Sequence, residues 1–158
     1  MDEHDGTARE WRESATLSLA GDFLLLDPMR RSFRDKEIDS ANEIVEFDLQ
    51  DVRDADIILV NYNKPSIGTS MEVFHASHDL GKFVVAFSPF TFKDSSPWMI
   101  KYCTKIVPNL EDACTYLKTH FVQIIGTNNI VLSLHRERRT GDRVSRVSIY
   151  PLQLKNRN

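Results

Sequence analysis

The sequence has few of the residues that mark a disulfide scaffold, a zinc site or a membrane span. Cys103 and Cys114 are the only cysteines among 158 residues, and they lack the paired spacing of either kind of site. No apolar run approaches the roughly 18 residues of a membrane span. Residues 1–13 are polar and acidic, whereas a signal peptide is basic and then apolar. We therefore expect two buried thiols in a cytoplasmic protein with no membrane association.

Glycine is also scarce, with six in the chain, and motifs that depend on closely spaced glycines are missing. The sequence contains no Gly-rich P-loop, no dinucleotide-binding fingerprint and no Gly-x-Ser-x-Gly nucleophile turn. We predict no cofactor and no bound metal.

Charge divides the chain into two parts. Hydrophobic residues make up 41% and charged residues 27%, which is typical of one globular domain of this length. Residues 121–158 hold seven Lys or Arg against two acidic residues, for +5, so residues 1–120 carry 13 minus 21, or −8. We expect an acidic α/β domain over 1–120 with a basic extension over 121–158, and nucleic acid is not expected to be the partner.

Hydrophobic spacing predicts alternating strands and helices along the first 120 residues. Apolar runs bounded by turn residues predict strands at 23–26, 57–60, 83–87 and 105–107. Three-and-four spacing predicts helices at 7–19, 40–53, 69–80 and 110–121. Gly21 and Gly81 are expected to end helices, and Ser40 with Glu43 matches a capping box. Residues 88–100 are interpreted as a loop.

The basic extension has a different pattern. Residues 122–125 and 129–134 are apolar or alternating, 136–143 form a charged turn, and 144–154 alternate again. This pattern predicts a β-hairpin that packs on or near the same domain.

The segment from 57 to 87 reads as a strand, a loop, a helix and a strand, which is a βαβ unit with parallel strands. Ligands of open parallel sheets bind at the carboxyl ends of the strands. The loop from Asn61 to Gly68 is therefore the predicted binding region, and Gly68 would let the backbone approach a ligand closely.

Glu72 is the main candidate for chemistry. We predict that it lies in the first turn of the helix after this loop, where the helix dipole favours the ionised carboxylate. Such a carboxylate is a credible nucleophile toward an electron-poor carbon, such as the anomeric carbon of a sugar. The alternative is that Glu72 merely complements the helix dipole.

Asp48 is the second candidate. It falls on the otherwise apolar stripe Ala41, Ile44, Val45, Asp48, Leu49 and Val52 of the helix before strand 57–60. A carboxylate there costs free energy unless it is hydrogen-bonded or functional. Asp48 could meet Glu72 at the end of the strand and handle a proton or hold a hydroxyl. The alternative is that it caps a loop or sits at the helix edge.

Three other groups give weaker signals. His75 and His78 are spaced for one helix face, but no third metal ligand has fitting spacing, so we expect a surface or packed pair. The segment 95–98, Ser-Ser-Pro-Trp, offers hydroxyls and an aromatic face for a base or phosphate, or it is a plain loop. The arginines of 136–146 could contact phosphate, although a solvated hairpin face is the expected role.

Several of these motifs occur together, in order, in one known family. They are Trp11-Arg12-Glu13, the run from Leu26 to Arg31 (Leu-Asp-Pro-Met-Arg-Arg), Glu46-Phe47-Asp48-Leu49, the run from Ala55 to Asn61, the run from Pro65 to Glu72, and Gly81-Lys82-Phe83-Val84-Val85. Over about 11–117 the chain resembles the nucleoside 2-deoxyribosyltransferases and their relatives that hydrolyse nucleoside 5′-monophosphates.

The resemblance implies a flavodoxin-like α/β fold and a Glu72 that attacks the anomeric carbon to form a covalent deoxyribosyl-enzyme. It implies that Asp48 assists the leaving base or orients the sugar, and that a second base or water completes the reaction. Asn61, Ser66, Gly68 and Met71 would bind the substrate, with Ser66 receiving a phosphate as in the monophosphate hydrolases. Ser96 lies roughly where those relatives lend a serine to a neighbouring subunit, which implies a homodimer or larger homo-oligomer.

One family element has no counterpart ahead of Trp11. Family members begin with a strand and Gly-containing loop at the centre of the sheet. Residues 16–21 could supply that strand, but no helix would then connect it to 23–28. Otherwise the true start lies upstream, a strand from 122–154 fills the gap, or the pocket is degenerate.

Other functions therefore stay open. A nucleotide-binding or interaction module of the same fold, without turnover, would also fit a missing first strand. A hydrolase of a larger N-glycoside, such as a dinucleotide, could use the same carboxylate chemistry.

Overall fold

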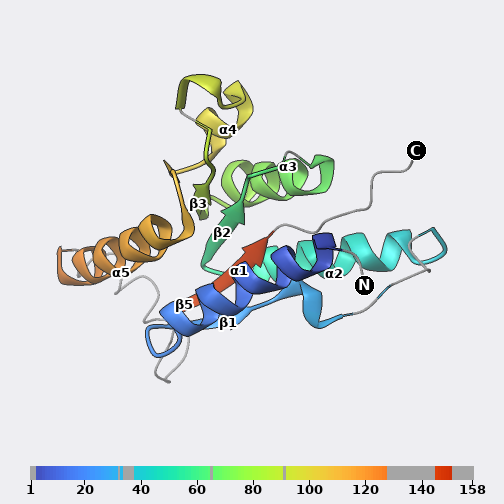
Figure 1. The fold of residues 1–158 in the computed structure, drawn as a ribbon, viewed down its shortest axis with the longest axis horizontal. Coiled ribbons are helices and arrows are strands. Elements are labelled where there is room, and N and C mark those ends of the chain that lie inside the picture. The colour runs from blue at the N-terminus through green and yellow to red at the C-terminus, as the bar shows by residue number, and fades with distance from the viewer. Residues whose placement is uncertain are drawn as a thin grey trace.

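The protein is an α/β domain built on a five-stranded sheet (Figure 1). The computed structural model describes residues 3–31, 33, 38–64, 66–90, 92–127 and 145–150. The strands are β1 (Phe23–Leu26), β2 (Ile57–Asn61), β3 (Phe83–Phe87), β4 (Lys105–Val107) and β5 (Ser145–Tyr150). The helices are α1 (Glu3–Leu19), α2 (Ala41–Asp54), α3 (Ile67–Phe74), α4 (Pro97–Tyr102) and α5 (Leu110–Thr127). Short 3-10 turns span Pro28–Arg30 and Phe92–Asp94, and a π-helical turn, His75–Asp79, continues α3.

Two apolar cores cover the two faces of the sheet. One core joins alternate residues of β2 and β3, such as Ile57 and Val85, to α1 and α5. The other joins the intervening residues, such as Ile58 and Val84, to α2, α3 and α4. Strands β2 and β3 are buried on both sides because their runs are continuously apolar, as expected of a parallel sheet covered by helices.

The last strand in the chain lies inside the sheet. The strand order is β1-β5-β2-β3-β4, and every pair is parallel. Leu25 of β1 pairs with Val147, and Ile57 of β2 pairs with the same residue from the other side. A strand from 145–150 therefore occupies an interior position, as one of the sequence alternatives predicted.

Two glycines and a lysine set the connections between these elements. Gly21 (φ +104°) and Gly81 (φ +61°) adopt the left-handed conformation that ends α1 and the π-helical turn, as predicted. The Nζ of Lys82 donates to the carbonyl oxygen of Val52 at 2.7 Å and also to those of Arg53 and Ala55. Lys82 thus satisfies the end of α2, where carbonyl groups have no partner within the helix.

Most of the predicted elements of residues 1–120 are confirmed. All four predicted strands are present. Helix α1 ends at Leu19 and α5 begins at Leu110, as predicted, and both ends of α2 lie within one residue of the prediction, whereas α1 begins four residues early. On α2, Ile44 and Val52 are buried as predicted, but Ala41 and Val45 are exposed and Leu49 is half-buried. Cys114 is buried as expected, whereas Cys103 is half-buried.

Other predictions differ from the structure. Helix α3 begins at Ile67, two residues early, and residues 97–102 form α4 where a loop was expected. Ser40 is the N-cap of α2 but makes no side-chain capping bond. Residues 122–125 are helical because α5 continues to Thr127. Strand β5 pairs in parallel with β1 and β2 on its two edges instead of forming a hairpin, and 129–134 lies outside the described residues.

No helix in the described part of the chain is long and apolar enough to cross a membrane.

Candidate functional site

The site lies at the edge of the sheet where the parallel strands end. The turn from Asp27 to Arg31 follows β1, and the segment that leads into α3 follows β2. Helix α2 packs between these two segments and contacts both β5 and α3. Three carboxylates and two guanidinium groups meet there, from these three segments.

Glu72 is buried on α3. Its side chain is only 5% exposed, and its Oε2 atom has no hydrogen-bond partner among the described residues. Burial, together with the nearby charges of Asp48 and Asp51, raises the pKa of Glu72 to about 8. Thr69, one helical turn earlier on the same face, also has a buried Oγ1 with no partner in the described part of the chain. Two such atoms on one face suit a polar ligand or water.

Asp48 faces the same region from α2. It is 7% exposed, and its Oδ1 lies 3.8 Å from Nη1 of Arg31. Burial and the charge of Asp51 raise the pKa of Asp48 to about 6, against the opposing effect of Arg31 and Arg30. Among the charged groups, Asp48 has the largest effect on the pKa of Glu72, followed by Asp51, so the two predicted residues belong to one electrostatic cluster.

One prediction about Glu72 is wrong. Glu72 lies in the second turn of α3, because the helix begins at Ile67, and no acidic residue occupies the first turn. The helix dipole acts mainly within that first turn, so burial and the neighbouring carboxylates dominate instead. Burial and the two aspartates therefore favour the protonated form of Glu72, whereas the sequence suggested that the helix dipole favours the ionised form.

A second buried aspartate and two arginines complete the cluster. Asp51 is 2% exposed and receives a bidentate pair from Arg30, at 2.6 and 2.9 Å, and a third bond from Nη2 of Arg31 at 2.6 Å. Sequence reasoning assigned these residues no role. The spacing of Asp51, three residues after Asp48 on one helix face, was a signal for Asp51, but it does not point to the two arginines.

The predicted substrate-binding residues take different positions around this cluster. Asn61 ends β2, and its Oδ1 accepts a bond from the Asn63 amide at 3.1 Å. Ser66 is the N-cap of α3 and accepts from the Thr69 amide at 3.3 Å. Gly68 lies inside the first turn of α3 and not in a loop. Met71 is 67% exposed, so its side chain faces solvent, whereas Glu72 is buried.

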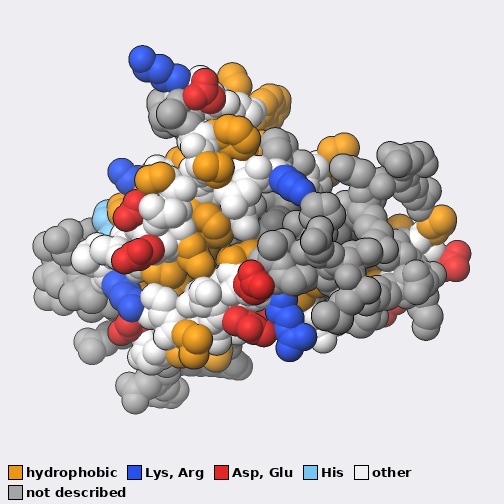
Figure 2. Space-filling model, viewed as in Figure 1, with side chains coloured by type: hydrophobic (Ala, Val, Ile, Leu, Met, Phe, Trp, Pro, Cys, Tyr) orange, Lys and Arg blue, Asp and Glu red, His pale blue; other side chains and the backbone are white. Residues whose placement is uncertain are grey.

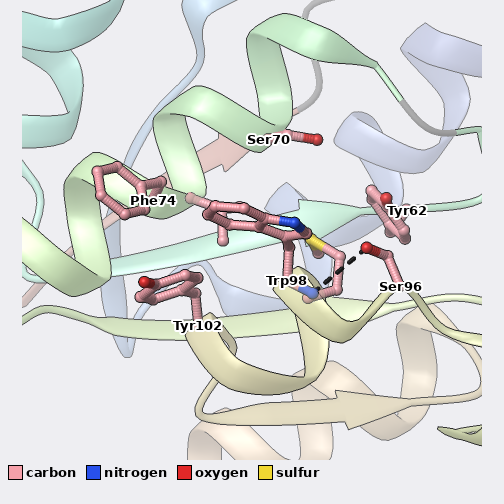
Figure 3. A pocket seen from close by; sticks show the side chains of 8 residues that line it. Tyr62, Ser70, Phe74, Ser96, Trp98 and Tyr102 are labelled. Atoms are coloured by element: carbon pink, nitrogen blue, oxygen red, sulfur yellow. Dashed lines mark hydrogen bonds between the residues drawn. The ribbon is translucent and has the colours of Figure 1, made fainter.

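Ser96 belongs to a separate pocket between α3 and α4. Ser96 is the N-cap of α4 and accepts from the Trp98 amide at 3.3 Å. The pocket has a volume of about 250 Å³, and Figure 3 shows Trp98 at its centre with Phe74 and Tyr102 on one side and Ser96 on the other. Its lining residues are Tyr62, Ser70, Val73, Phe74, Ser96, Trp98, Met99 and Tyr102. Neither Glu72 nor Asp48 lines it.

The surface around α4 carries exposed apolar side chains. Hydrophobic side chains lie at the top of the view in Figure 2, over the region of α4 in Figure 1, beside a basic and an acidic side chain. Trp98 is 63% exposed, and Phe90, before α4, is also exposed.

The two histidines form a packed surface pair, as predicted. The Nδ1 of each ring donates to the Asp79 carboxylate, at 2.7 Å for His75 and 2.9 Å for His78, and the His78 ring stacks on Phe74. The described residues include no group of three His, Cys, Asp or Glu side chains placed to hold a metal ion. Residues 136–143 lie outside the described residues.

The cluster can hold and exchange a proton between two carboxyl groups. With Arg30 and Arg31 positive and Asp51 negative, one proton shared by Asp48 and Glu72 brings the five side chains to neutrality. Different environments separate the pKa values of two carboxyl groups, so that one can act as an acid and the other as a nucleophile.

The chain was also compared with known proteins. No protein-family model matches it, and a search of curated proteins gave no match.

Proposed function

We propose that this protein cleaves the N-glycosidic bond of 2′-deoxynucleosides or of their 5′-monophosphates. The observation that carries the proposal is the buried Glu72, whose Oε2 has no partner among the described residues, in one cluster with Asp48 at the strand-end edge of the sheet. The resemblance of residues 11–117 to the nucleoside 2-deoxyribosyltransferases indicates which bond is cleaved, because it aligns these two residues with that family's nucleophile and assisting aspartate.

The strand order supports the flavodoxin-like form of the fold. If β5 is counted as the first strand, the order β1-β5-β2-β3-β4 becomes 2-1-3-4-5, which is the order of flavodoxin-like sheets. In such sheets ligands bind at the strand ends where the order reverses, here between β5 and β2. The loop after β2 and the start of α3 lie at this edge.

The first step uses the shared proton. As C1′ becomes electron-poor, the ionised form of Glu72 is favoured and the proton moves to Asp48. A Glu72 oxygen then forms a bond to C1′ while the bond from C1′ to the base breaks. The bond's electron pair goes to the base nitrogen, and Asp48 donates its proton to the leaving base.

The second step restores the site. Water, or a second base, attacks C1′ and displaces the Glu72 oxygen. Asp48 takes the proton that the attacking group loses, so Glu72 is released as a carboxylate. Ser66 is the proposed contact for a 5′-phosphate. Ser96, the N-cap of α4, is the proposed contribution to a neighbouring subunit in a homo-oligomer.

The proposal is tested by incubating the protein with each of the four 2′-deoxynucleosides and their 5′-monophosphates and measuring the released base by chromatography. We expect Glu72→Gln to abolish release and Asp48→Asn to lower it by about 10²–10⁴-fold, the usual contribution of a general acid. Intact mass after substrate addition should show a deoxyribosyl adduct in wild type and none in Glu72→Gln.

Glu46→Gln is the matched control, because Glu46 is an exposed carboxylate on α2 with a side chain 73% exposed. It should release base at the wild-type rate. If wild type and Glu72→Gln release base equally, Glu72 is not the nucleophile.

A binding module without turnover is the second candidate. It is favoured by the protonated state of Glu72, since a neutral carboxyl group is a poor nucleophile. Thermal unfolding with the same nucleotides separates the two candidates. An increase in Tm without base release supports the module, whereas base release supports the enzyme.

A further inference from the structure

Arg30 and Arg31 are adjacent in sequence but differ in what they contact. Arg30 is 45% exposed and binds both oxygens of Asp51, and it also donates to the Asp27 carbonyl oxygen at 2.8 Å. Arg31 is 19% exposed and bridges two carboxylates, with Nη2 at 2.6 Å from Asp51 and Nη1 at 3.8 Å from Asp48. Arg31 therefore connects Asp51 to the candidate acid.

The guanidinium of Arg31 is fixed on a third side. Its Cζ lies 4.7 Å from the centre of the Phe47 ring, in a cation–π contact. Asp51 is buried and accepts three bonds from the two arginines, so it anchors the side chain of Arg31. The planar guanidinium is therefore oriented before any substrate arrives.

Asp48 needs such a partner. Its charged neighbours include Asp51 on its own helix, Glu72 on α3, and Arg30 and Arg31 from the turn after β1. Arg31 has the largest favourable effect on the Asp48 carboxylate, ahead of Arg30. Loss of Arg31 would remove this effect while the unfavourable effect of Asp51 stays.

We propose that Arg31, anchored by Asp51, is a positioning residue that holds the Asp48 carboxylate toward Glu72 for the proposed proton transfer. This inference rests on the proposed function. It adds Arg31 and Asp51 to the residues that support the reaction. Arg31 contacts no reacting atom in this scheme, and it acts through Asp48.

Titration of the side-chain carboxyl carbon of Asp48 by NMR, without substrate, tests the contact directly. In Arg31→Gln we expect the pKa of Asp48 to rise by about one unit or more, because an opposite charge at this distance lowers an aspartate pKa by about that much. Arg30→Gln removes a neighbouring arginine that binds the same Asp51, and it should raise that pKa less. Equal shifts in the two variants, or no shift in Arg31→Gln, would overturn the inference.

Arg31→Lys is a second variant, which keeps the inference testable if Arg31→Gln does not fold. Lysine keeps the charge but lacks the planar fork that reaches both aspartates, so a smaller rise of the Asp48 pKa is expected than with glutamine. A wild-type value in Arg31→Lys, with Arg31→Gln shifted, would show that charge alone matters and that the bridging geometry does not.

The same variants separate this inference from the proposed function. If wild type releases base, Arg31→Gln should lower kcat at least about tenfold and move the acidic limb of the pH profile upward, with KM little changed. An unchanged kcat and pH profile would overturn the positioning role and leave the enzyme proposal standing. Absence of base release by wild type would instead overturn the proposed function, while the NMR titration still reports on the contact.

Discussion

Burial of Glu72 opposes its proposed role, because burial favours the protonated carboxyl group and the nucleophile is the carboxylate. An ordinary glutamate is ionised at neutral pH, but burial and two nearby aspartates raise the pKa of Glu72 to about 8. Its Oε2 atom is buried with no partner among the described residues. Keeping the proton costs less than burying a third negative charge in this cluster. A substrate with a developing positive charge would reverse that balance.

This raised pKa predicts that stability falls as the pH rises. Between about pH 4.5 and pH 8 the folded protein keeps a proton on Glu72 that the unfolded chain has lost. The unfolded state therefore binds fewer protons, and the free energy of unfolding decreases with pH. From pH 5.5 to pH 7.5 we expect a decrease of about 2–3 kcal/mol from this group, at about 1.4 kcal/mol per pH unit. Urea denaturation at the two pH values measures it.

Glutamine at position 72 supplies the comparison, since it has the same shape and no titration. Glu72→Gln should lose most of this decrease and be more stable than wild type at pH 7.5. Glu46→Gln, at an exposed position, should keep the wild-type decrease. If the free energy of unfolding changes with pH equally in wild type and Glu72→Gln, Glu72 is ionised in the folded protein.

The sequence predicted part of the site and missed the rest for physical reasons. Glu72 was found because it lies in the helix that follows the predicted binding loop, and Asp48 was found because it interrupts an apolar stripe. Asp51 was missed because its burial depends on Arg30 and Arg31, which precede it by about twenty residues. Such an ion pair depends on tertiary contact, and spacing along one helix does not indicate it.

At the level of elements, Lys82 links the start of β3 to the end of α2. Its ammonium group donates to three carbonyl oxygens of residues 52–55, and burial lowers its pKa. Positive charge at a helix C-terminus is favourable, and the bonds satisfy carbonyl groups that the helix leaves free. This contact holds α2, and with it Asp48 and Asp51, against the sheet.

Lys82→Met should therefore destabilise the protein. The methionine side chain keeps most of the aliphatic stem but removes the charge and the three bonds. We expect a loss of about 1–3 kcal/mol in the free energy of unfolding, measured by urea denaturation. Lys93→Met, at an exposed position, removes the same charge and should change stability by less than about 0.5 kcal/mol. A similar effect of both variants would mean that the bonds of Lys82 contribute nothing.

Element prediction failed where local patterns are weak. Helix α4 has six residues and begins at Pro97 after two serines, so its sequence also suits a loop. Ser96 and Pro97 at the first positions of a helix were the available signal. The extension of α5 to Thr127 was missed because the apolar run at 122–125 is equally compatible with a strand.

At the level of the whole molecule, the position of β5 is the feature that the sequence left most open. The pattern of 144–154 predicted a strand, but pairing partners far apart in the chain leave no local signal. Strand β5 lies between β1 and β2, and its parallel direction brings its carboxyl end to the edge where α1 begins (Figure 1). A connection from β5 to α1 would therefore form a βαβ unit with β1.

This arrangement predicts that the chain tolerates circular permutation. Joining residue 158 to residue 1 and opening the chain between 127 and 145 would place β5 first, with 151–158 and 1–2 as its connection to α1. Because every strand keeps its neighbours, we expect the permuted protein to unfold in one cooperative transition, as judged by circular dichroism in urea. A control that ends at residue 127 lacks β5, exposes one edge each of β1 and β2, and should lose that transition. A truncated chain as stable as wild type would show that β5 contributes nothing to the sheet, and a permuted chain that fails to fold would show that the order of the segments matters beyond their pairing.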